Sequence, residues 1–200
     1  AVLDNASVKC WGNNYNGQLG LGNTSDMGDN PGEMGDNLPV VKLGTGRTAT
    51  AISAGHYHSC AMLDNGAVKC WGLNYNSGRL GAGTSSSEVG SSSNHMGANL
   101  VAVDFGDDLR ATDLSAGFAH SCAVLENGLS KCWGYHYASY GTLLTGSSST
   151  TIWGDSSADM GTNLPYLDLG TDRATIQISA STQYSCAILD DGNVKCWGYG

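Results

Sequence analysis

The spacing of the cysteines is the feature that most limits how this chain can fold. Six of the seven cysteines form three pairs, and the two members of each pair are ten residues apart. The pairs are Cys60 with Cys70, Cys122 with Cys132, and Cys186 with Cys196. The second members, counted from Cys10 through Cys70 and Cys132 to Cys196, are 60, 62 and 64 residues apart. Such regular spacing indicates a structural unit that is repeated along the chain.

The residues around the cysteines recur in a fixed order as well. The segment from His58 to Gly72 contains His-Ser-Cys-Ala, a turn and Lys-Cys-Trp-Gly, and this order returns from His120 to Gly134. A third copy, from Tyr184 to Gly198, has Tyr in place of the first His, and residues 1–12 carry only the second half. The copies divide the chain into the final strand of a preceding repeat at 1–12, and repeats over 13–72, 73–134 and 135–200. The chain is therefore expected to begin inside a hairpin.

Each repeat is predicted to form a small antiparallel sheet. In the first repeat, runs of strand length lie between turn residues at Val40–Leu43, Ala49–Ala54, Ser59–Leu63 and Ala67–Trp71. The turn Asp64-Asn65-Gly66 fits a three-residue hairpin loop with Gly66 in the left-handed conformation. This register places Cys60 opposite Cys70 at a non-hydrogen-bonded site, where the Cα atoms of the two strands approach most closely. A cross-strand disulfide suits that distance and would fix the register of the hairpin.

The cysteine pairs also allow a second interpretation, as metal ligands. His58, Cys60 and Cys70 offer three donor groups, and the set recurs at His120, Cys122 and Cys132. The third repeat lacks the His, no fourth ligand recurs, and the spacing lacks the Cys-x-x-Cys knuckle of structural zinc sites. We therefore prefer disulfides, expect no metal, and expect the partner of Cys10 to lie outside the chain, just before residue 1. Disulfides predict an oxidising compartment, extracellular or at the cell surface.

Composition excludes two classes of function. Nine basic against 18 acidic residues give a formal net charge of −9, whereas a nucleic-acid binder needs a basic face to neutralise phosphates. No apolar stretch approaches the roughly 20 residues that span a bilayer. We therefore expect neither nucleic-acid binding nor membrane insertion. The 29 glycines and the low share of charged residues, 14%, disfavour a helical bundle and favour many tight turns.

The polar side chains beside the cysteines do not form a catalytic set. His58 and His120 lie at strand entries, where a ring nitrogen is expected to bond a neighbouring turn. Ser59 and Ser121 follow them directly, and neighbours on a strand point to opposite faces. Because no nucleophile or carboxylate partner recurs, we interpret the histidines as structural and expect no enzyme activity. No glycine-rich segment leads into a helix with Lys-Ser/Thr, so no cofactor is expected.

The long loops of the repeats carry further candidate sites. They run over 20–34, 81–96 and 141–160 and are rich in Ser, Thr, Gly and Asp, and we expect them on one exposed face. The first loop and its continuation hold four crowded acids, Asp26, Asp29, Glu33 and Asp36. These do not follow the EF-hand spacing, so we interpret them as a solvated acidic loop and keep weak Ca²⁺ binding as a hypothesis. Asn5 and Asn23 fit the N-glycosylation acceptor pattern.

Four of the five tryptophans lie at the same position of the repeat, and the fifth does not. Directly after the second cysteine of every copy stands a Trp, at Trp11, Trp71, Trp133 and Trp197. We expect these four to pack between repeats, because a large apolar ring at a fixed repeat position indicates buried contact. Trp153 lies off the repeat in a polar loop, and is either an exposed contact residue or a local anchor for that loop.

The combined pattern resembles a known family. The run from Ile52 to Gly81 contains Ile-Ser-Ala-Gly-x-x-His-Ser-Cys-Ala, then Gly-x-Val-x-x-Trp-Gly-x-Asn and finally Gly-x-Leu-Gly. It resembles the repeat of the regulator of chromosome condensation family, and the resemblance extends over essentially the whole chain. It implies seven-bladed propellers with four strands per blade, which act as exchange factors for a small nuclear GTPase or as modules of larger ligases. The third repeat departs from the pattern at Tyr140-Gly141-Thr142-Leu143, Ser181 and Tyr184, and the paired cysteines are an addition to it.

The predicted fold class is therefore all-β, with tandem antiparallel blades in a propeller-like or open array and hairpins pinned by disulfides. The leading hypothesis for function is a non-enzymatic extracellular structural or adhesive repeat protein. It would assemble end to end, with copies of itself or with neighbouring repeats, as a filament building block that bears glycans. The alternative is a fragment of a closed propeller that binds a protein partner through its loop face, as an exchange factor or adaptor. A secreted lectin-like or hydrolytic module is a third hypothesis.

Overall fold

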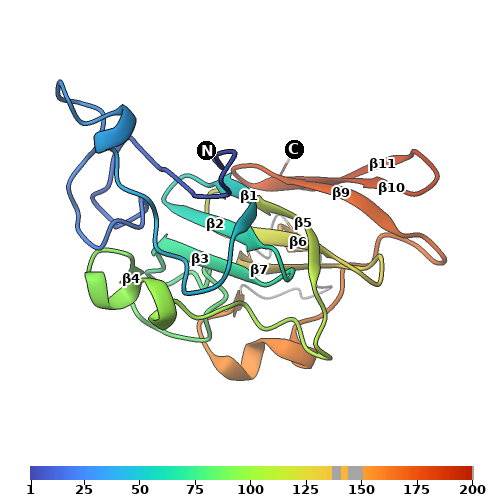
Figure 1. Cartoon of the computed structure of the whole chain (residues 1–200). Helices are drawn as coiled ribbons and strands as arrows, with labels where there is room; N and C mark the ends of the chain where they lie inside the picture. Colours follow the sequence, from blue (N-terminus) through green and yellow to red (C-terminus); the bar gives the residue numbers. More distant parts are fainter. Residues whose placement is uncertain (137–140, 144–150, 200) are drawn as a thin grey trace.

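The computed structural model describes residues 1–136, 141–143 and 151–199, and within those ranges it contains short strands, turns and 3-10 helices but no α-helix. In this described part of the chain, eleven strands form three antiparallel sheets, one for each repeat (Figure 1). The prediction of an all-β chain of tandem antiparallel blades is therefore confirmed. Tyr140, at which the third repeat departs from the family pattern, lies outside the described residues.

Each blade repeats the same strand order. The first blade has the order β1-β2-β3-β4 and comprises β1 (Ala49–Ala54), β2 (His58–Leu63), β3 (Val68–Leu73) and β4 (Glu88–Val89). The second comprises β5 (Ala111–Ala116), β6 (His120–Leu125), β7 (Ser130–His136) and β8 (Thr151–Trp153). The third comprises β9 (Thr175–Ala180), β10 (Tyr184–Leu189) and β11 (Val194–Gly198). The 3-10 helices lie at Gly35–Asn37, Ser93–His95, Gly97–Asn99, Ser157–Asp159 and Gly161–Asn163.

The β2–β3 hairpin shows how the cysteine spacing and the turn sequence agree. Gly66 has a φ of +76°, and the Leu63 N–H donates to the Ala67 carbonyl at 2.9 Å, which closes a three-residue loop. Cys60 then lies opposite Cys70, with 4.0 Å between their Cα atoms. Equivalent disulfides join Cys122 to Cys132 and Cys186 to Cys196. The three predicted disulfides are confirmed, and Cys10 is the free cysteine of the chain.

The strand predicted at Val40–Leu43 is wrong. This segment forms no strand, although the Val41 N–H donates to the Val8 carbonyl at 2.8 Å. Val41 and Leu43 are buried in the core of the first blade, whereas Val40 is 47% exposed. The apolar alternation that predicted a strand therefore reflects packing of one side of an extended segment, and not pairing into a sheet.

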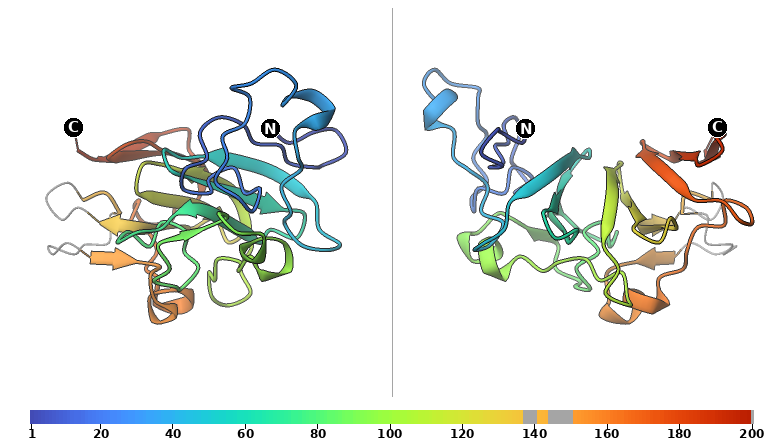
Figure 2. Two further views of the ribbon diagram at one scale, coloured as in Figure 1. Left: turned by 90° about the vertical axis from the view of Figure 1, so that its left-hand side faces the viewer. Right: turned by 45° about the vertical axis from the view of Figure 1, so that its right-hand side comes forward.

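The blades pack on one another around their inner strands. β1 contacts β5, and β5 contacts β9, so the first strand of each blade lines the inner side of a curved array (Figure 2). Trp71 and Trp133 are fully buried between blades, and their Nε1–H groups donate to the carbonyls of Gln18 and Arg79, each at 3.0 Å. These two tryptophans have the expected packing role. Trp11 differs from them, because half of its surface, 52%, is exposed.

Trp153 is an anchor and not an exposed contact residue. It lies in β8, is partly buried, and packs against the apolar clusters on both sides of the second blade. The 3-10 helices at Ser93–His95, Gly97–Asn99, Ser157–Asp159 and Gly161–Asn163 lie along the outer rim of the array, away from β1, β5 and β9 (Figure 2). In the described part of the chain, no helix has the length and apolar character needed to cross a bilayer.

Candidate functional site

The repeated histidines join neighbouring blades. The Nε2 atom of His58 lies 2.8 Å from the Oγ of Ser121, and the Nε2 of His120 lies 2.9 Å from the Oγ of Ser185. In each case β2 or β6 presents a histidine to a serine on the matching strand of the next blade. The expectation that these rings bond a neighbouring turn is therefore corrected, since the Nε2 partner lies more than 60 residues away in sequence.

The hydrogen-bond pattern assigns the state of the His58 ring. The Ser121 hydroxyl donates its one hydrogen to the Arg79 carbonyl at 3.0 Å, so it can only accept from His58. The ring therefore carries its hydrogen on Nε2. Burial lowers the pKa of His58 to about 3, with the positive charge of Arg79 and the ring of His120 adding to the effect. Burial also lowers the pKa of His120 to about 4. Both rings are neutral near pH 7, and His58 donates its Nε2–H to the Ser121 hydroxyl.

A glycine lies against each of these buried rings. A Cβ atom added to Gly55 would lie 2.5 Å from the Gly117 carbonyl oxygen and 2.7 Å from Cε1 of His58. Gly117 has the same position against His120. In the third blade, Ser181 replaces the glycine and Tyr184 replaces the histidine, and the tyrosine side chain is 46% exposed. The glycine is thus present where a buried ring requires the space.

The lysines that precede the second cysteines cap backbone turns. Lys131 Nζ donates to the carbonyls of Phe105 at 2.8 Å and Gly161 at 2.9 Å, and the side chain is buried. Lys9, Lys69 and Lys195 make equivalent bonds to turn carbonyls. Four of the nine basic residues of the chain thus donate hydrogen bonds to backbone carbonyls of turns. The surface that remains is strongly acidic, which disfavours an anionic partner.

Two acids of the first long loop accept hydrogen bonds from backbone N–H groups of the loop and of the segment before it. Asp26 accepts the backbone N–H of Asn14 at 2.6 Å, and Glu33 accepts the N–H groups of Gly28 and Asn30 at 2.7 and 3.1 Å. These backbone bonds lower the pKa of Glu33. Asp29 and Asp36 lie on the exposed parts of the same loop. Among the described residues, no group of three or more His, Cys, Asp or Glu is arranged to hold a metal ion.

Both glycosylation sequons are exposed and lie in turns. The Asn5 side-chain oxygen accepts from the Ser7 N–H at 3.0 Å and from the Ser7 hydroxyl at 2.6 Å. The Asn23 side-chain oxygen accepts from the Ser25 N–H at 2.9 Å. Either asparagine can be reached from solvent, and glycosylation at these positions stays a prediction.

Exposed aromatic side chains gather on one face of the array, which we call the turn face. It comprises the turns 55–57, 117–119 and 181–183, between the first and second strands, and the segments 13–16 and 74–77 after the third strands. The Leu73 N–H donates to the Tyr57 carbonyl at 2.9 Å and so holds two of these parts together. Tyr15 and Tyr75 are 77% and 63% exposed. The face therefore presents tyrosines at the same place in two successive repeats.

An aromatic cluster stands between the first two turns of this face. The ring centroids of His56 and Tyr57 are 4.3 Å apart, and Phe118 lies 4.9 Å from His56 and 5.7 Å from Tyr57. The His56 N–H donates to the Gly117 carbonyl at 3.1 Å, which fixes one turn against the next. These contacts hold the three rings in place relative to one another.

Sequence reasoning missed these aromatic residues. A usable signal was present, because Asn-Tyr-Asn follows Trp-Gly at residues 14–16 and again at 74–76. The asparagines at its start are buried and hold the loop: Asn14 accepts from the Leu19 N–H at 2.9 Å, and Asn74 donates to the Thr84 carbonyl at 2.9 Å. The tyrosine between two asparagines therefore has to point outward, at a position set by the repeat.

Comparison with known proteins gives consistent matches along the chain. Models of the regulator of chromosome condensation (RCC1) repeat match residues 7–62 and residues 49–77, 111–141 and 176–200. E3 ubiquitin-protein ligase HERC2 of Mus musculus is 28% identical over 207 residues, and Ultraviolet-B receptor UVR8 of Arabidopsis thaliana is 25% identical over 202 residues. Both alignments cover 100% of this chain, but only 4% of HERC2 and 38% of UVR8.

Solved structures show the same fold. Human WBSCR16 superposes with a TM-score of 0.65 at 20% identity, over 95% of this chain and 42% of that one. Prp20p from Saccharomyces cerevisiae, which was studied for its binding to Gsp1p and histones, superposes with a TM-score of 0.59 at 18% identity. That superposition covers 97% of this chain and 41% of Prp20p. The chain thus spans well under half the length of these relatives.

Proposed function

Because the chain belongs to the regulator of chromosome condensation repeat family, we propose that it is a non-enzymatic blade array that binds a protein partner through its turn face. The exposure of Tyr15 and Tyr75, at the end of the blades that also holds the His56, Tyr57 and Phe118 cluster, is the observation that carries this proposal. Tyrosine is enriched in protein interfaces, because its rigid ring buries a large area and its hydroxyl stays hydrogen-bonded.

The disposition of the repeated polar groups supports binding over catalysis. His58 and His120 are buried and use Nε2 in the contact between blades, so neither ring is available to a substrate. Ser121 and Ser185 are buried at the same contacts. The strongly lowered pKa values of the two histidines also make them poor general bases near neutral pH.

The alternative hypothesis from the sequence places partner binding on the loop face, and we propose the turn face in its place. In the first long loop, Asp26 and Glu33 already accept backbone N–H groups of Asn14 and Gly28. The turn face instead combines ordered turns with exposed rings, which limits the entropy lost on binding. Among relatives, Prp20p was studied for its binding to other proteins, Gsp1p and histones, and we extend only the general class, a protein partner, to this chain.

The test is site-specific photo-crosslinking in the source cells. A benzophenone amino acid at Tyr75 should yield a crosslinked protein that is lost when Tyr15 is also changed to alanine. The matched control carries the same probe at Val101, which is 57% exposed and lies near the start of β3, at the end opposite the turn face. A product formed equally from both positions would contradict the proposal.

The disulfides support a second proposal, about compartment. We infer that the protein works outside the cell or at its surface, where a structural or adhesive array assembled end to end is the alternative function. The three disulfides are the observation in its favour. Native material should show free thiol at Cys10 alone, or at no cysteine, after alkylation under denaturing conditions. Reactive thiols at the six paired cysteines would overturn the proposal, and electron microscopy would separate filaments from discrete particles.

A further inference from the structure

A pocket lies before the start of β1, at the end of this strand opposite the turn face. This pocket, which we call the lead-in pocket, has a volume of about 430 Å³ and is formed by the turn 5–8, the segment 40–49 and residues 97–98. Buried aliphatic side chains of the first-blade core line it, among them Val8, Val41 and Leu43. Its volume is in the range of small-molecule sites, which combine an apolar lining with a few polar groups.

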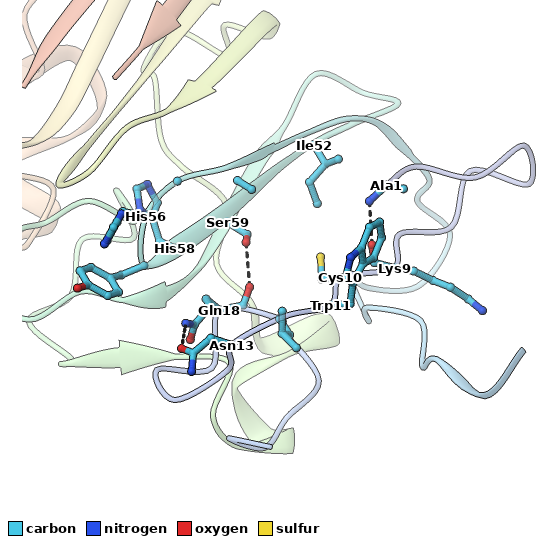
Figure 3. A pocket seen from close by; sticks show the side chains of 14 residues that line it. Ala1, Lys9, Cys10, Trp11, Asn13, Gln18, Ile52, His56, His58 and Ser59 are labelled. Carbon is cyan, nitrogen blue, oxygen red and sulfur yellow. Dashed lines mark hydrogen bonds between the residues drawn. The ribbon is translucent and has the colours of Figure 1, made fainter. Parts of the chain in front are cut away.

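A larger hollow lies at the turn end of the first blade. It has a volume of about 520 Å³, and Figure 3 shows Cys10 and Trp11 on one side of it and His56 and Ser59 on the other. Ser59 corresponds to Ser121 and Ser185, the serines that are buried in the contacts between blades. This hollow therefore belongs to the surface on which blades stack, and we assign no ligand to it.

The lead-in pocket does not arise from stacking of the blades. The second repeat has a matching hollow of about 470 Å³, lined by Asn65, Ala67 and residues between 103 and 110. At that place the blades on both sides, the first and the second, are complete with four strands each. The hollow is thus a regular feature of the repeat, and the side chains that line it determine what it can bind.

Charge distinguishes the lead-in pocket from the matching hollow. The segment 40–49 contains Lys42 and Arg47 and no acidic residue, so its charge is +2. The matching segment 102–111 has one basic and three acidic residues and a charge of −2, and 166–175 has one basic and two acidic residues and a charge of −1. Although the chain as a whole carries a net charge of −9, this one wall is positive and favours an anionic ligand.

Lys42 is a departure from the pattern of the later repeats. Asp104 and Asp168 stand at the same position there, and each accepts the backbone N–H of a turn glycine, at 2.8 and 3.1 Å. An ammonium group cannot accept a hydrogen bond, so Lys42 cannot stabilise the turn in this way. The Lys42 ammonium group also forms no hydrogen bond or ion pair with the described residues. A residue that breaks a local rule of the repeat without a compensating contact indicates a functional position.

Two further cations lie at this pocket. Arg47 lines it and meets Asp64 at 3.6 Å, in an ion pair whose side chains are 48% and 38% exposed. Because an ion pair this exposed contributes little, the guanidinium can turn to a ligand. Lys69 lies directly behind the wall, since a Cβ atom built on Gly44 would be 3.4 Å from its Nζ atom.

We propose that the lead-in pocket binds a small organic carboxylate with an aliphatic body. The carboxylate pairs with Lys42 and Arg47, and the aliphatic body packs on Val41 and Leu43. One negative charge suffices, because Arg47 is shared with Asp64. The affinity comes from charge-assisted hydrogen bonds and from burial of the aliphatic body. This inference does not depend on the partner proposed for the turn face, since the pocket lies at the other end of the strands.

The test is a titration of the intact, oxidised chain with octanoate, followed by NMR spectra of the backbone amides. We expect saturable chemical-shift changes at residues 41–48. Octylamine has the same body with the opposite charge, and acetate lacks the body, so each should bind at least about tenfold more weakly than octanoate. Equal binding of octanoate and octylamine, or no saturable change with octanoate, would overturn the proposal.

Two substitutions introduce residues that the other repeats carry at the same positions. Lys42→Asp follows Asp104 and Asp168, and Arg47→Leu follows Leu109, so both variants are compatible with the repeat. Each should weaken octanoate binding at least about tenfold, the factor that one charge-assisted hydrogen bond supplies.

Arg173→Leu is the matched control for Arg47→Leu. Arg173 stands at the same position of the third repeat and meets Asp190 at 3.5 Å, also in an exposed ion pair, but it lies outside the pocket. Its replacement should leave octanoate binding unchanged. The proposal is wrong if Arg173→Leu weakens binding as much as Arg47→Leu does, or if Lys42→Asp binds octanoate as tightly as the parent chain.

Discussion

At the scale of single residues, the contact between blades depends on three small or compact groups that fit one another. Gly55 leaves room for the ring of His58, and that ring reaches the hydroxyl of Ser121. Gly55 does not have a positive φ, so space and not backbone conformation explains the glycine. Replacing it with a larger residue should therefore act on the contact between blades alone.

We predict that Gly55→Ala destabilises the chain by about 2–4 kcal/mol, because the new methyl group displaces either the His58 ring or the Gly117 carbonyl. The measurement is the free energy of unfolding in urea with the disulfides intact. Ser181→Gly is the matched control, since the equivalent position in the third blade adjoins Tyr184 and needs no space for a buried ring. This explanation is contradicted if Gly55→Ala lowers the free energy of unfolding by no more than Ser181→Gly does.

The buried histidines also predict how stability depends on pH. Their pKa values fall from 6.5 to about 3 for His58 and to about 4 for His120 on folding, so the unfolded chain binds more protons below pH 6.5. Their contribution is fully present above pH 6.5 and is lost as the pH falls through the folded pKa values. Each ring should lower the free energy of unfolding by up to about 1.4 kcal/mol per pH unit in this window.

Urea titrations between pH 7 and pH 4.5 measure this dependence. In His120→Ala the slope should be about half that of the parent chain, because one of the two titrating rings is gone. A slope that persists after both His58 and His120 are replaced would show that other groups cause it.

At the scale of the element, the hairpins follow from local sequence and the contacts between blades do not. Asp64-Asn65-Gly66 determines the turn and the ten-residue spacing of Cys60 and Cys70 determines the register, so both could be predicted. The sequence predicts a strand at Val40–Leu43 because its buried and exposed residues alternate with the two-residue period of a strand. In the structure this segment packs against the core without pairing into a sheet. The partner of His58 could not be predicted, because it is 63 residues away and only the stacking of two sheets brings it close.

The hairpin disulfides should differ in their resistance to reduction. Cys122 and Cys132 are 0% and 1% exposed between the second and third blades, whereas Cys186 and Cys196 are on the more open outward face of the third blade. We expect dithiothreitol at neutral pH to reduce the Cys186–Cys196 bond first, since attack by a thiolate requires access to a sulfur atom. Alkylation followed by peptide mapping gives the order. Simultaneous reduction of the three bonds under native conditions would contradict it.

At the scale of the whole molecule, the chain is an array in which each blade depends on its neighbours for burial. The first and second blades share a core that includes Val68, Leu114 and Trp133, and the second and third share another. The outward face of the third blade exposes Ile188 and Val194, at 38% and 62%. In such an array, stability is a sum of blade and contact contributions, and within residues 1–200 the second blade is the one with a shared core on each side.

Hydrogen exchange should therefore be graded along the array. We predict that amides of β9 to β11 exchange at least about tenfold faster than those of β5 to β7, because the third blade opens locally while the second is covered on both faces. Exchange measured by mass spectrometry on the intact, oxidised chain tests this, and the first blade provides an internal reference. Uniform protection of the three blades would show that the array unfolds as one unit.

Binding to the turn face is the central claim, and the affinity of the chain for its crosslinked partner tests it most directly. The account predicts that Tyr15→Ala combined with Tyr75→Ala weakens binding by at least about tenfold, because both rings are anchors at the same surface. Val40→Ala combined with Val101→Ala, which removes exposed apolar side chains away from the turn face, should leave the dissociation constant unchanged. The claim is contradicted if the tyrosine variant binds as tightly as the parent chain, or if the valine variant loses as much affinity.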